Sequence, residues 1–265
     1  METQTKQLIK TTFVNIGLAT CIFAALLLVL WIVELLFPSL QLLKWHDAAW
    51  CVGIPASIIG VAYILTIKDP QNYVGFYPGI LMSVLLGVQF FLQKQYDSTL
   101  LYFCVFIPFQ VMSIINWKKP QDDNKPFAPT FLSVKGLLLN QLALILIVAA
   151  DYLLATYVIN HDGILDNFWI KLFNGLLIAS SVLANFWLIY RKNDAWRYWV
   201  VYSISGIILF IILGNIFSIV LFIFFLVINA MAGIAWYRST PADNKGWVND
   251  VEKQRADIKK KIRRH

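Results

Sequence analysis

Two segments of this chain, IPFQVMSIINWKK (107–119) and LVINAMAGIAWYR (226–238), can be superposed by a shift of 119 residues. In each segment an amide side chain is followed seven residues later by a tryptophan. The pairs at this offset are Gln110 and Asn229, Trp117 and Trp236, Gly87 and Gly206, and Tyr77 and Trp196. Agreement of several pairs at one offset predicts an internal duplication.

The composition is typical of a membrane protein. Of the 265 residues, 59% are hydrophobic and 14% are charged, whereas soluble domains carry about 45–50% apolar and about 25% charged residues. The apolar residues form eight runs long enough to cross a hydrocarbon core of about 30 Å. These runs are 12–36, 47–66, 73–92, 98–117, 136–159, 168–190, 196–213 and 215–237. We therefore expect an all-α polytopic membrane protein with eight transmembrane helices, the last two separated by a tight turn at Gly214-Asn215.

The basic residues are distributed unevenly between the two sides of these spans. Nineteen of the 22 Lys and Arg residues lie on the side of the two termini, and only Lys44, Lys94 and Lys171 lie on the other. By the positive-inside rule, both termini are expected in the cytoplasm. The net charge of +7 lies between apolar runs and in the tail, which predicts contact with the lipid bilayer rather than with nucleic acid.

Several functional classes are excluded by residue type. Cys21, Cys51 and Cys104 lie inside apolar runs without zinc or redox spacing, and the three histidines are scattered. The sequence has no P-loop motif, and no nucleophile is paired with a base within a span. We expect no metal, no cofactor and no enzymatic activity.

The duplication predicts how the helices are arranged. Each repeat contains three spans, and because that number is odd, a single linker helix between them restores the same orientation. The expected parts are an extra N-terminal transmembrane helix (1–46), a first repeat (47–118), a loop and linker helix (119–160), a second repeat (161–238) and a basic cytoplasmic tail (239–265). Parallel repeats of this kind place the substrate between the two halves.

The duplicated layout and a few short motifs resemble the PnuC family of bacterial vitamin transporters over about residues 47–240. The motifs are Trp196-x2-Trp199 opening the seventh span, Tyr96-Asp97-Ser98 opening the fourth, and Gln110 with Trp117-Lys118-Lys119 at the end of the fourth. Ser203 and Ser113-Ile-Ile-Asn-Trp117 depart from the family pattern, because many members carry Asn or Asp at the first position and Gly-Trp-Tyr-x-Trp at the second.

The resemblance implies a SWEET-like 3+1+3 fold, a homotrimer and a location in the bacterial cytoplasmic membrane. It implies transport of nicotinamide riboside, or a closely related nucleoside-like vitamin, by facilitated diffusion, with phosphorylation inside the cell trapping the substrate. Relatives carry thiamine, riboflavin or deoxynucleosides, so a thiamine or deoxynucleoside transporter is an alternative. A substrate-binding subunit of an ATP-driven importer is a second alternative.

Aromatic and hydroxyl side chains at the start of the seventh span suit such a substrate. Trp196, Trp199 and Ser203 share one helix face, and Tyr202 adjoins it. A base stacked on an aromatic ring gains about 1–3 kcal/mol, and a cationic nicotinamide ring adds a cation–π interaction of up to about 2 kcal/mol. Tryptophans also gather at membrane interfaces, so Trp196 suits either a belt or a site, and Tyr198 is assigned to the belt.

Amide side chains within the spans are the second group of candidates: Gln89, Gln110, Asn185 and Asn229. An amide that faces hydrocarbon without a partner costs several kcal/mol, so each must contact a substrate or a neighbouring helix. Gln110 and Asn229 occupy equivalent repeat positions and are expected to contact substrate. Pro108, just before Gln110, is expected to kink its helix and to assist the movement of the repeats.

One carboxylate, Asp151, lies deep within a span. An intramembrane carboxylate is a candidate proton carrier. Asp151 belongs to the linker helix, however, so a hydrogen bond to a neighbouring residue is the alternative.

Overall fold

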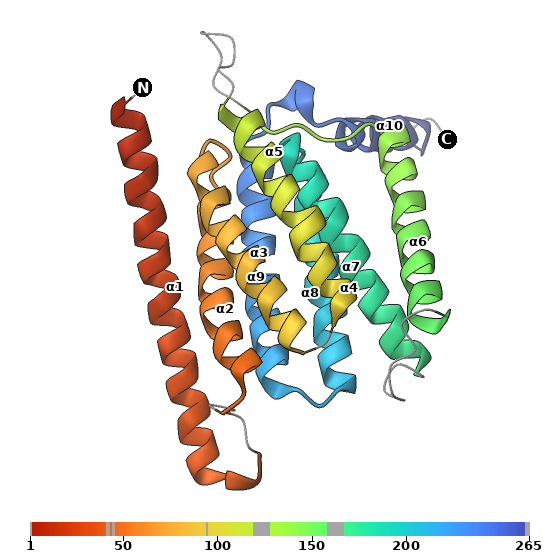
Figure 1. Ribbon diagram of the computed structural model, residues 1–265. Coiled ribbons are helices and arrows are strands. Elements are labelled where there is room, and N and C mark those ends of the chain that lie inside the picture. The colour runs from red at the N-terminus through yellow and green to blue at the C-terminus, as the bar shows by residue number, and fades with distance from the viewer. Residues whose placement is uncertain are drawn as a thin grey trace. The chain divides into compact units, whose positions relative to one another are not determined.

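Figure 1 shows the protein as a computed structural model, which describes residues 2–40, 43, 46–93, 95–118, 128–157 and 167–262. The regular elements in this part of the chain are helices, with one isolated bridge between Thr130 and Lys192. The chain divides into two compact units. The first unit contains residues 1–123 and 215–221, and the second contains residues 124–214 and 222–265.

The first unit begins with a long helix that packs against the helix after it. Its elements are α1 (Glu2–Leu36), η1 (Pro38–Leu40), α2 (Ala48–Ile67), η2 (Tyr73–Gly75), α3 (Phe76–Leu92), α4 (Tyr96–Leu101), a π-helical turn (Tyr102–Phe106) and α5 (Ile107–Lys118). Asp47 starts α2, because its carboxylate accepts the N–H groups of Ala49 and Trp50 at 2.9 and 3.3 Å. Asn15 of α1 donates to the Thr66 hydroxyl of α2 at 3.1 Å.

The second unit contains the remaining helices and the tail. Its elements are α6 (Val134–Tyr157), α7 (Phe168–Ile189), α8 (Asp194–Ile212), α9 (Ile216–Ser239) from Phe222 onward, η5 (Ala242–Asn244) and α10 (Trp247–Ile262). Asn167 caps α7 by accepting the Trp169 N–H at 2.8 Å. After α8, Gly214 adopts a φ of 67°, which glycine tolerates without strain. The tight turn predicted at Gly214-Asn215 is therefore confirmed.

Eight helices among the described residues are long and apolar enough to cross a membrane. The eight predicted spans are thus confirmed, and the protein is an all-helical multi-pass membrane protein. The first helix differs from its predicted span, since it begins at Glu2 rather than near residue 12. The polar residues before that position contain no glycine or proline, so the helix continues through them. The exposed apolar side chains of α1 and α6, such as Phe13 and Leu138, suit contact with lipid.

The fourth span is interrupted before Pro108. Proline has no N–H group to donate to the carbonyl four residues earlier. The preceding turn, Tyr102–Phe106, widens to a π-helix, in which the Ile107 N–H bonds the Tyr102 carbonyl. A break in α-helical hydrogen bonding therefore lies where the sequence predicted a kink. The counterpart of this span at the 119-residue offset, α9, is a continuous α-helix.

Among the described residues, a close contact between a glycine and a phenylalanine ring occurs once in each unit. A Cβ atom added to Gly87 of α3 would lie 2.7 Å from the Phe103 ring. One added to Gly206 of α8 would lie even closer to the Phe222 ring of α9. The two phenylalanines are separated by the same 119 residues as the two glycines. This match supports the duplication, while the parallel relation of the repeats and the domain boundaries remain predictions.

We expect Gly206→Ala to destabilise the protein by roughly 1–3 kcal/mol, because the added methyl group overpacks against Phe222. Gly87→Ala should destabilise less, since its clash is milder. Thermal unfolding of the purified protein in detergent measures both effects. Gly17→Ala is the matched control: a Cβ there meets nothing within 4 Å, so it should leave stability unchanged or raise it. Equal melting temperatures for all three variants would contradict the close contacts.

Candidate functional site

A buried hydrogen-bonded cluster connects α8 and α9 in the second unit. Trp196, Trp199 and Ser203 share one face of α8, and both Ser203 and Asn229 of α9 are 0% exposed. The Asn229 Nδ2 group donates to the Trp199 carbonyl at 3.3 Å and to Ser203 Oγ at 3.1 Å. Ser203 Oγ donates to the same carbonyl at 2.8 Å. The structure therefore brings together three of the predicted site residues. We call Trp199, Ser203 and Asn229 the amide cluster.

Three polar groups in and beside the amide cluster have no hydrogen-bond partner among the described residues. They are Asn229 Oδ1 and the indole Nε1 groups of Trp196 and Trp199. Buried polar atoms in native proteins are nearly always hydrogen-bonded, and an orphan costs about 1–3 kcal/mol. A buried acceptor and two buried donors left without partners are therefore candidates for contact with a bound ligand.

Aromatic rings surround these polar groups. Trp196 packs edge-to-face on Trp236 with ring centroids 5.5 Å apart, and Trp199 packs similarly on Tyr202 at 5.3 Å. Trp196 is 2% exposed, which excludes a lipid-facing belt position for it. The belt assignment of Tyr198 is wrong, because that side chain is also 2% exposed. The Tyr198 side chain is buried because other parts of the unit pack against α8 on more than one side.

A cavity of about 440 Å³ lies between α8 and α9, in the size range of small-molecule sites. Trp196 and Val200 of α8, and Asn229 and Gly233 of α9, contribute to its wall, which is largely apolar. Arg197 also lines it. Asn229 adjoins this space with its side chain fully buried.

A second group of buried polar atoms lies in the first unit. The Gln110 amide lies directly over Gly79 of α3, and the Tyr63 hydroxyl of α2 lies beside it. The Tyr63 hydroxyl and the Gln110 amide face each other, and the amide makes no other hydrogen bond among the described residues. Gln110 was predicted to contact substrate. Tyr63 was missed, although a tyrosine inside an apolar run is the same kind of signal as the amides.

The other two predicted amides have structural contacts. The Gln89 amide lies against Gly53 of α2, so that glycine leaves room for it between α2 and α3. Asn185 of α7 donates to the Ser181 carbonyl of its own helix at 3.0 Å. These contacts favour a packing role for both residues.

Asp151 lies at the contact between α6 and α7. A Cβ added to Gly175 of α7 would lie 3.3 Å from the Asp151 carboxylate. One turn earlier on α7, the buried Lys171 ammonium donates to the Thr156 hydroxyl at 3.2 Å and lies 5.7 Å from the Tyr152 ring. These polar contacts lie at the same helix pair as Asp151, and the role of Asp151 stays a prediction.

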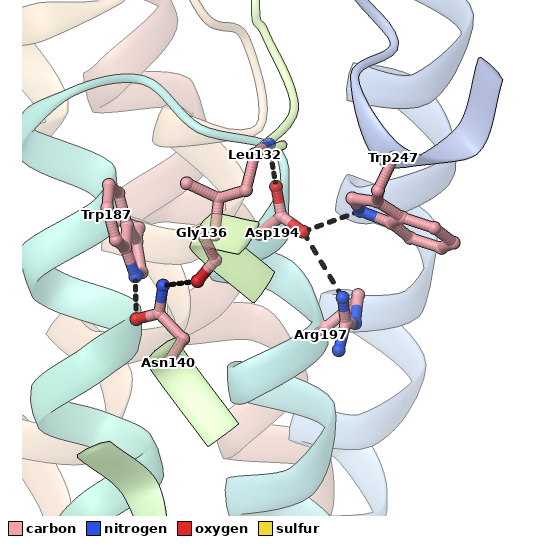
Figure 2. A network of polar contacts seen from close by, with 7 residues as sticks. All are labelled: Leu132, Gly136, Asn140, Trp187, Asp194, Arg197 and Trp247. Atoms are coloured by element: carbon pink, nitrogen blue, oxygen red, sulfur yellow. Dashed lines mark hydrogen bonds and ion pairs between the residues drawn. The ribbon is translucent and has the colours of Figure 1, made fainter. Parts of the chain in front are cut away.

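The start of α8 is held by a buried carboxylate, which Figure 2 shows. Asp194 is fully buried and accepts three hydrogen bonds: from the Leu132 N–H at 2.8 Å, from Trp247 Nε1 at 2.9 Å and from Arg197 at 3.2 Å. It therefore connects α8 to the segment before α6 and to the start of α10.

Backbone contacts extend this connection. The Thr130 carbonyl accepts the Asn193 N–H at 2.9 Å, and the Leu132 carbonyl accepts the Trp247 N–H at 2.8 Å. Lys192 donates to the Thr130 hydroxyl at 2.8 Å. Burial lowers the pKa of Lys192, and the nearby Asp194 charge opposes this by raising it. Sequence reasoning missed Asp194, because an acidic residue at a helix start is favourable without any tertiary partner.

We expect Asp194→Asn to destabilise the protein by about 1–3 kcal/mol, because the new NH₂ group must face one of the N–H donors that the carboxylate accepts. Arg197→Gln is the control. Its side chain is 38% exposed in the ion pair with Asp194, so its loss should cost no more than about 1 kcal/mol. Thermal unfolding compares the two. Equal losses would mean that the bonds to Leu132 and Trp247 contribute little.

The chain was compared with known proteins. The model of the nicotinamide mononucleotide transporter family matches residues 50–238. No curated protein matches the chain. Among solved structures, the chain is similar to a crystal structure of the vitamin B3 transporter PnuC, with 15% sequence identity and a TM-score of 0.59. That match covers 86% of this chain and 88% of the other.

The structural likeness shows the fold, and the family match shows descent, since it extends over more than half of the chain. Both agree with the resemblance seen in the sequence motifs. The chain belongs to the nicotinamide mononucleotide transporter (PnuC) family, a family of membrane transporters rather than enzymes.

Proposed function

We propose that this protein carries nicotinamide riboside, or a closely related nucleoside-like vitamin, across a bacterial cytoplasmic membrane by facilitated diffusion. The observation that supports this most is the set of buried, unpartnered hydrogen-bonding groups beside tryptophan rings. They are Asn229 Oδ1 and the Trp196 and Trp199 indoles in the second unit. The family assignment supplies the context, because a protein of the same fold is a vitamin B3 transporter.

These groups match the chemistry of a nicotinamide nucleoside. Its flat, cationic ring gains from an aromatic face through stacking and cation–π attraction. Its carboxamide carries both a donor and an acceptor, and its ribose carries hydroxyls. Asn229 Oδ1 can accept from such a donor, while the indole N–H groups can donate to such an acceptor. To carry these groups through an apolar layer, the protein must supply hydrogen bonds in place of the water molecules around them.

The family name raises nicotinamide mononucleotide as a second candidate. That compound differs by a phosphate group, whose charge of about −2 requires Arg or Lys partners when it is buried. The predicted and observed candidate groups are Trp, Tyr, Ser, Asn and Gln, all uncharged. Arg197 lines the cavity, but it is already paired with Asp194. The site therefore favours the dephosphorylated riboside.

Energy coupling and assembly follow from the same proposal. We propose uniport, with phosphorylation in the cell keeping the product inside, and a homotrimer as the PnuC resemblance implies. The orientation with both termini in the cytoplasm rests on the charge distribution. The break before Pro108 gives one helix a point where it can bend at low cost.

The purified protein in proteoliposomes should equilibrate labelled nicotinamide riboside without ATP or an ion gradient. Nicotinamide mononucleotide should compete at least tenfold more weakly, because its phosphate lacks a buried cationic partner. Asp151→Asn should leave the rate within a factor of about two if Asp151 has only the neighbour-bonding role. Accumulation that depends on a proton gradient and disappears in Asp151→Asn would contradict uniport. Tight binding without any transport would favour the ATP-driven subunit instead.

Trp199→Ala should weaken binding of nicotinamide riboside about 5- to 150-fold, the range for loss of one base stack. Trp199→Phe should recover part of the affinity, since a ring remains. Isothermal titration of the detergent-purified protein measures both. Trp169→Ala, at a side chain of α7 that is 55% exposed, is the control and should bind normally. An unchanged affinity in Trp199→Ala would remove this ring from the site. Preferential binding of thiamine or a deoxynucleoside would select an alternative substrate.

A further inference from the structure

The orientation of the Asn229 amide is determined by its two partners. Its Nδ2 group faces the Trp199 backbone carbonyl at 3.3 Å and Ser203 Oγ at 3.1 Å. A carbonyl oxygen can only accept a hydrogen bond. The Ser203 hydroxyl proton is already donated to the same carbonyl at 2.8 Å, so Ser203 can only accept from Asn229. A flipped amide would place Oδ1 against two acceptors.

This arrangement determines what Asn229 offers to a ligand. The Trp199 carbonyl and Ser203 Oγ are hydrogen-bonded to each other, so they lie on the same side of Nδ2 and hold the amide with Oδ1 turned away from both. Oδ1 is buried without a partner among the described residues, and Asn229 contributes to the cavity wall. Asn229 therefore presents Oδ1 as a buried acceptor. Without the serine hydroxyl, one of the two interactions that oppose the flip is lost, and Nδ2 could turn toward the ligand.

We propose that Ser203 is a positioning residue that makes the site select for a ligand donor at Asn229, and thereby for a nicotinamide over a nicotinate group. The carboxamide can donate to Oδ1. A carboxylate has no proton to donate, and its charge repels the lone pairs of Oδ1. This inference rests on the proposed function, and it assigns Ser203 a role through Asn229 rather than direct contact with substrate.

The test is a pair of affinities, for nicotinamide riboside and for nicotinic acid riboside, measured by titration of the full-length purified protein. The wild type should bind the amide at least tenfold more tightly. In Ser203→Ala the ratio of the two affinities should fall about 3- to 10-fold, the factor of one hydrogen bond. Ser203→Thr keeps the hydroxyl and should restore the ratio. Ser205→Ala is the matched control: it removes a buried hydroxyl from the same helix and should leave the ratio unchanged.

A ratio in Ser203→Ala within twofold of the wild-type ratio would overturn the inference, provided both compounds bind. Asn229→Ala supplies a second check, because loss of the acceptor must also narrow the ratio. If Asn229→Ala leaves the ratio unchanged, Asn229 does not contact the carboxamide and the inference is wrong. Failure of the wild type to bind either compound would overturn the proposed function itself, which distinguishes the two results. Melting temperatures confirm that each variant is folded.

Discussion

The constraint on which this structure depends is the absence of water in the hydrocarbon layer. Every N–H and C=O group there must find a partner within the protein, and helices provide one within a single segment. This accounts for eight apolar helices among the described residues. It also gives weight to side chains that break the pattern. The helical backbone satisfies its own hydrogen bonds, so an unpartnered Asn229 oxygen stands out as a candidate ligand contact.

Polar side chains inside this protein have two kinds of role, and the hydrogen bonds of each side chain show which role it has. Asp194 has three donors and holds α8 to the segment before α6 and to α10. Asn140 is similar: it accepts from the Trp187 indole at 2.7 Å and donates to the Gly136 carbonyl at 2.7 Å (Figure 2). These groups are satisfied and therefore structural. In the amide cluster, the Asn229 Nδ2 group has hydrogen-bond partners, whereas Oδ1 has none among the described residues. An open group of this kind suits ligand binding, whereas a fully hydrogen-bonded group such as Asp194 holds segments of the chain together.

The sequence was sufficient for the elements and for the class of protein. The apolar runs predicted all eight spans, the Gly214-Asn215 turn was located, and short aromatic motifs identified the family. Hydrogen bonds between side chains of different helices could not be predicted from the sequence. Ser203 and Asn229 were both named as candidates, but their mutual hydrogen bond joins residues 26 positions apart and follows from helix packing. Tyr198 was misplaced because helical periodicity assigns faces and does not reveal how many of them are covered. The function of Asp194 depends on Leu132 and Trp247, which no local pattern connects to it.

The glycine–phenylalanine crossings also bear on the history of the chain. A phenylalanine ring can lie this close to a helix backbone only where the facing residue is a glycine. The glycine and the phenylalanine must therefore occur together for the contact to form. If the two predicted repeats, 47–118 and 161–238, descend from one ancestral three-helix segment, this contact was already present before the copies separated. The spans that carry Phe103 and Phe222 nevertheless differ. A π-helical turn and Pro108 interrupt the first, whereas the second is a continuous α-helix, so only the first has a break in its α-helical hydrogen bonding where it can bend.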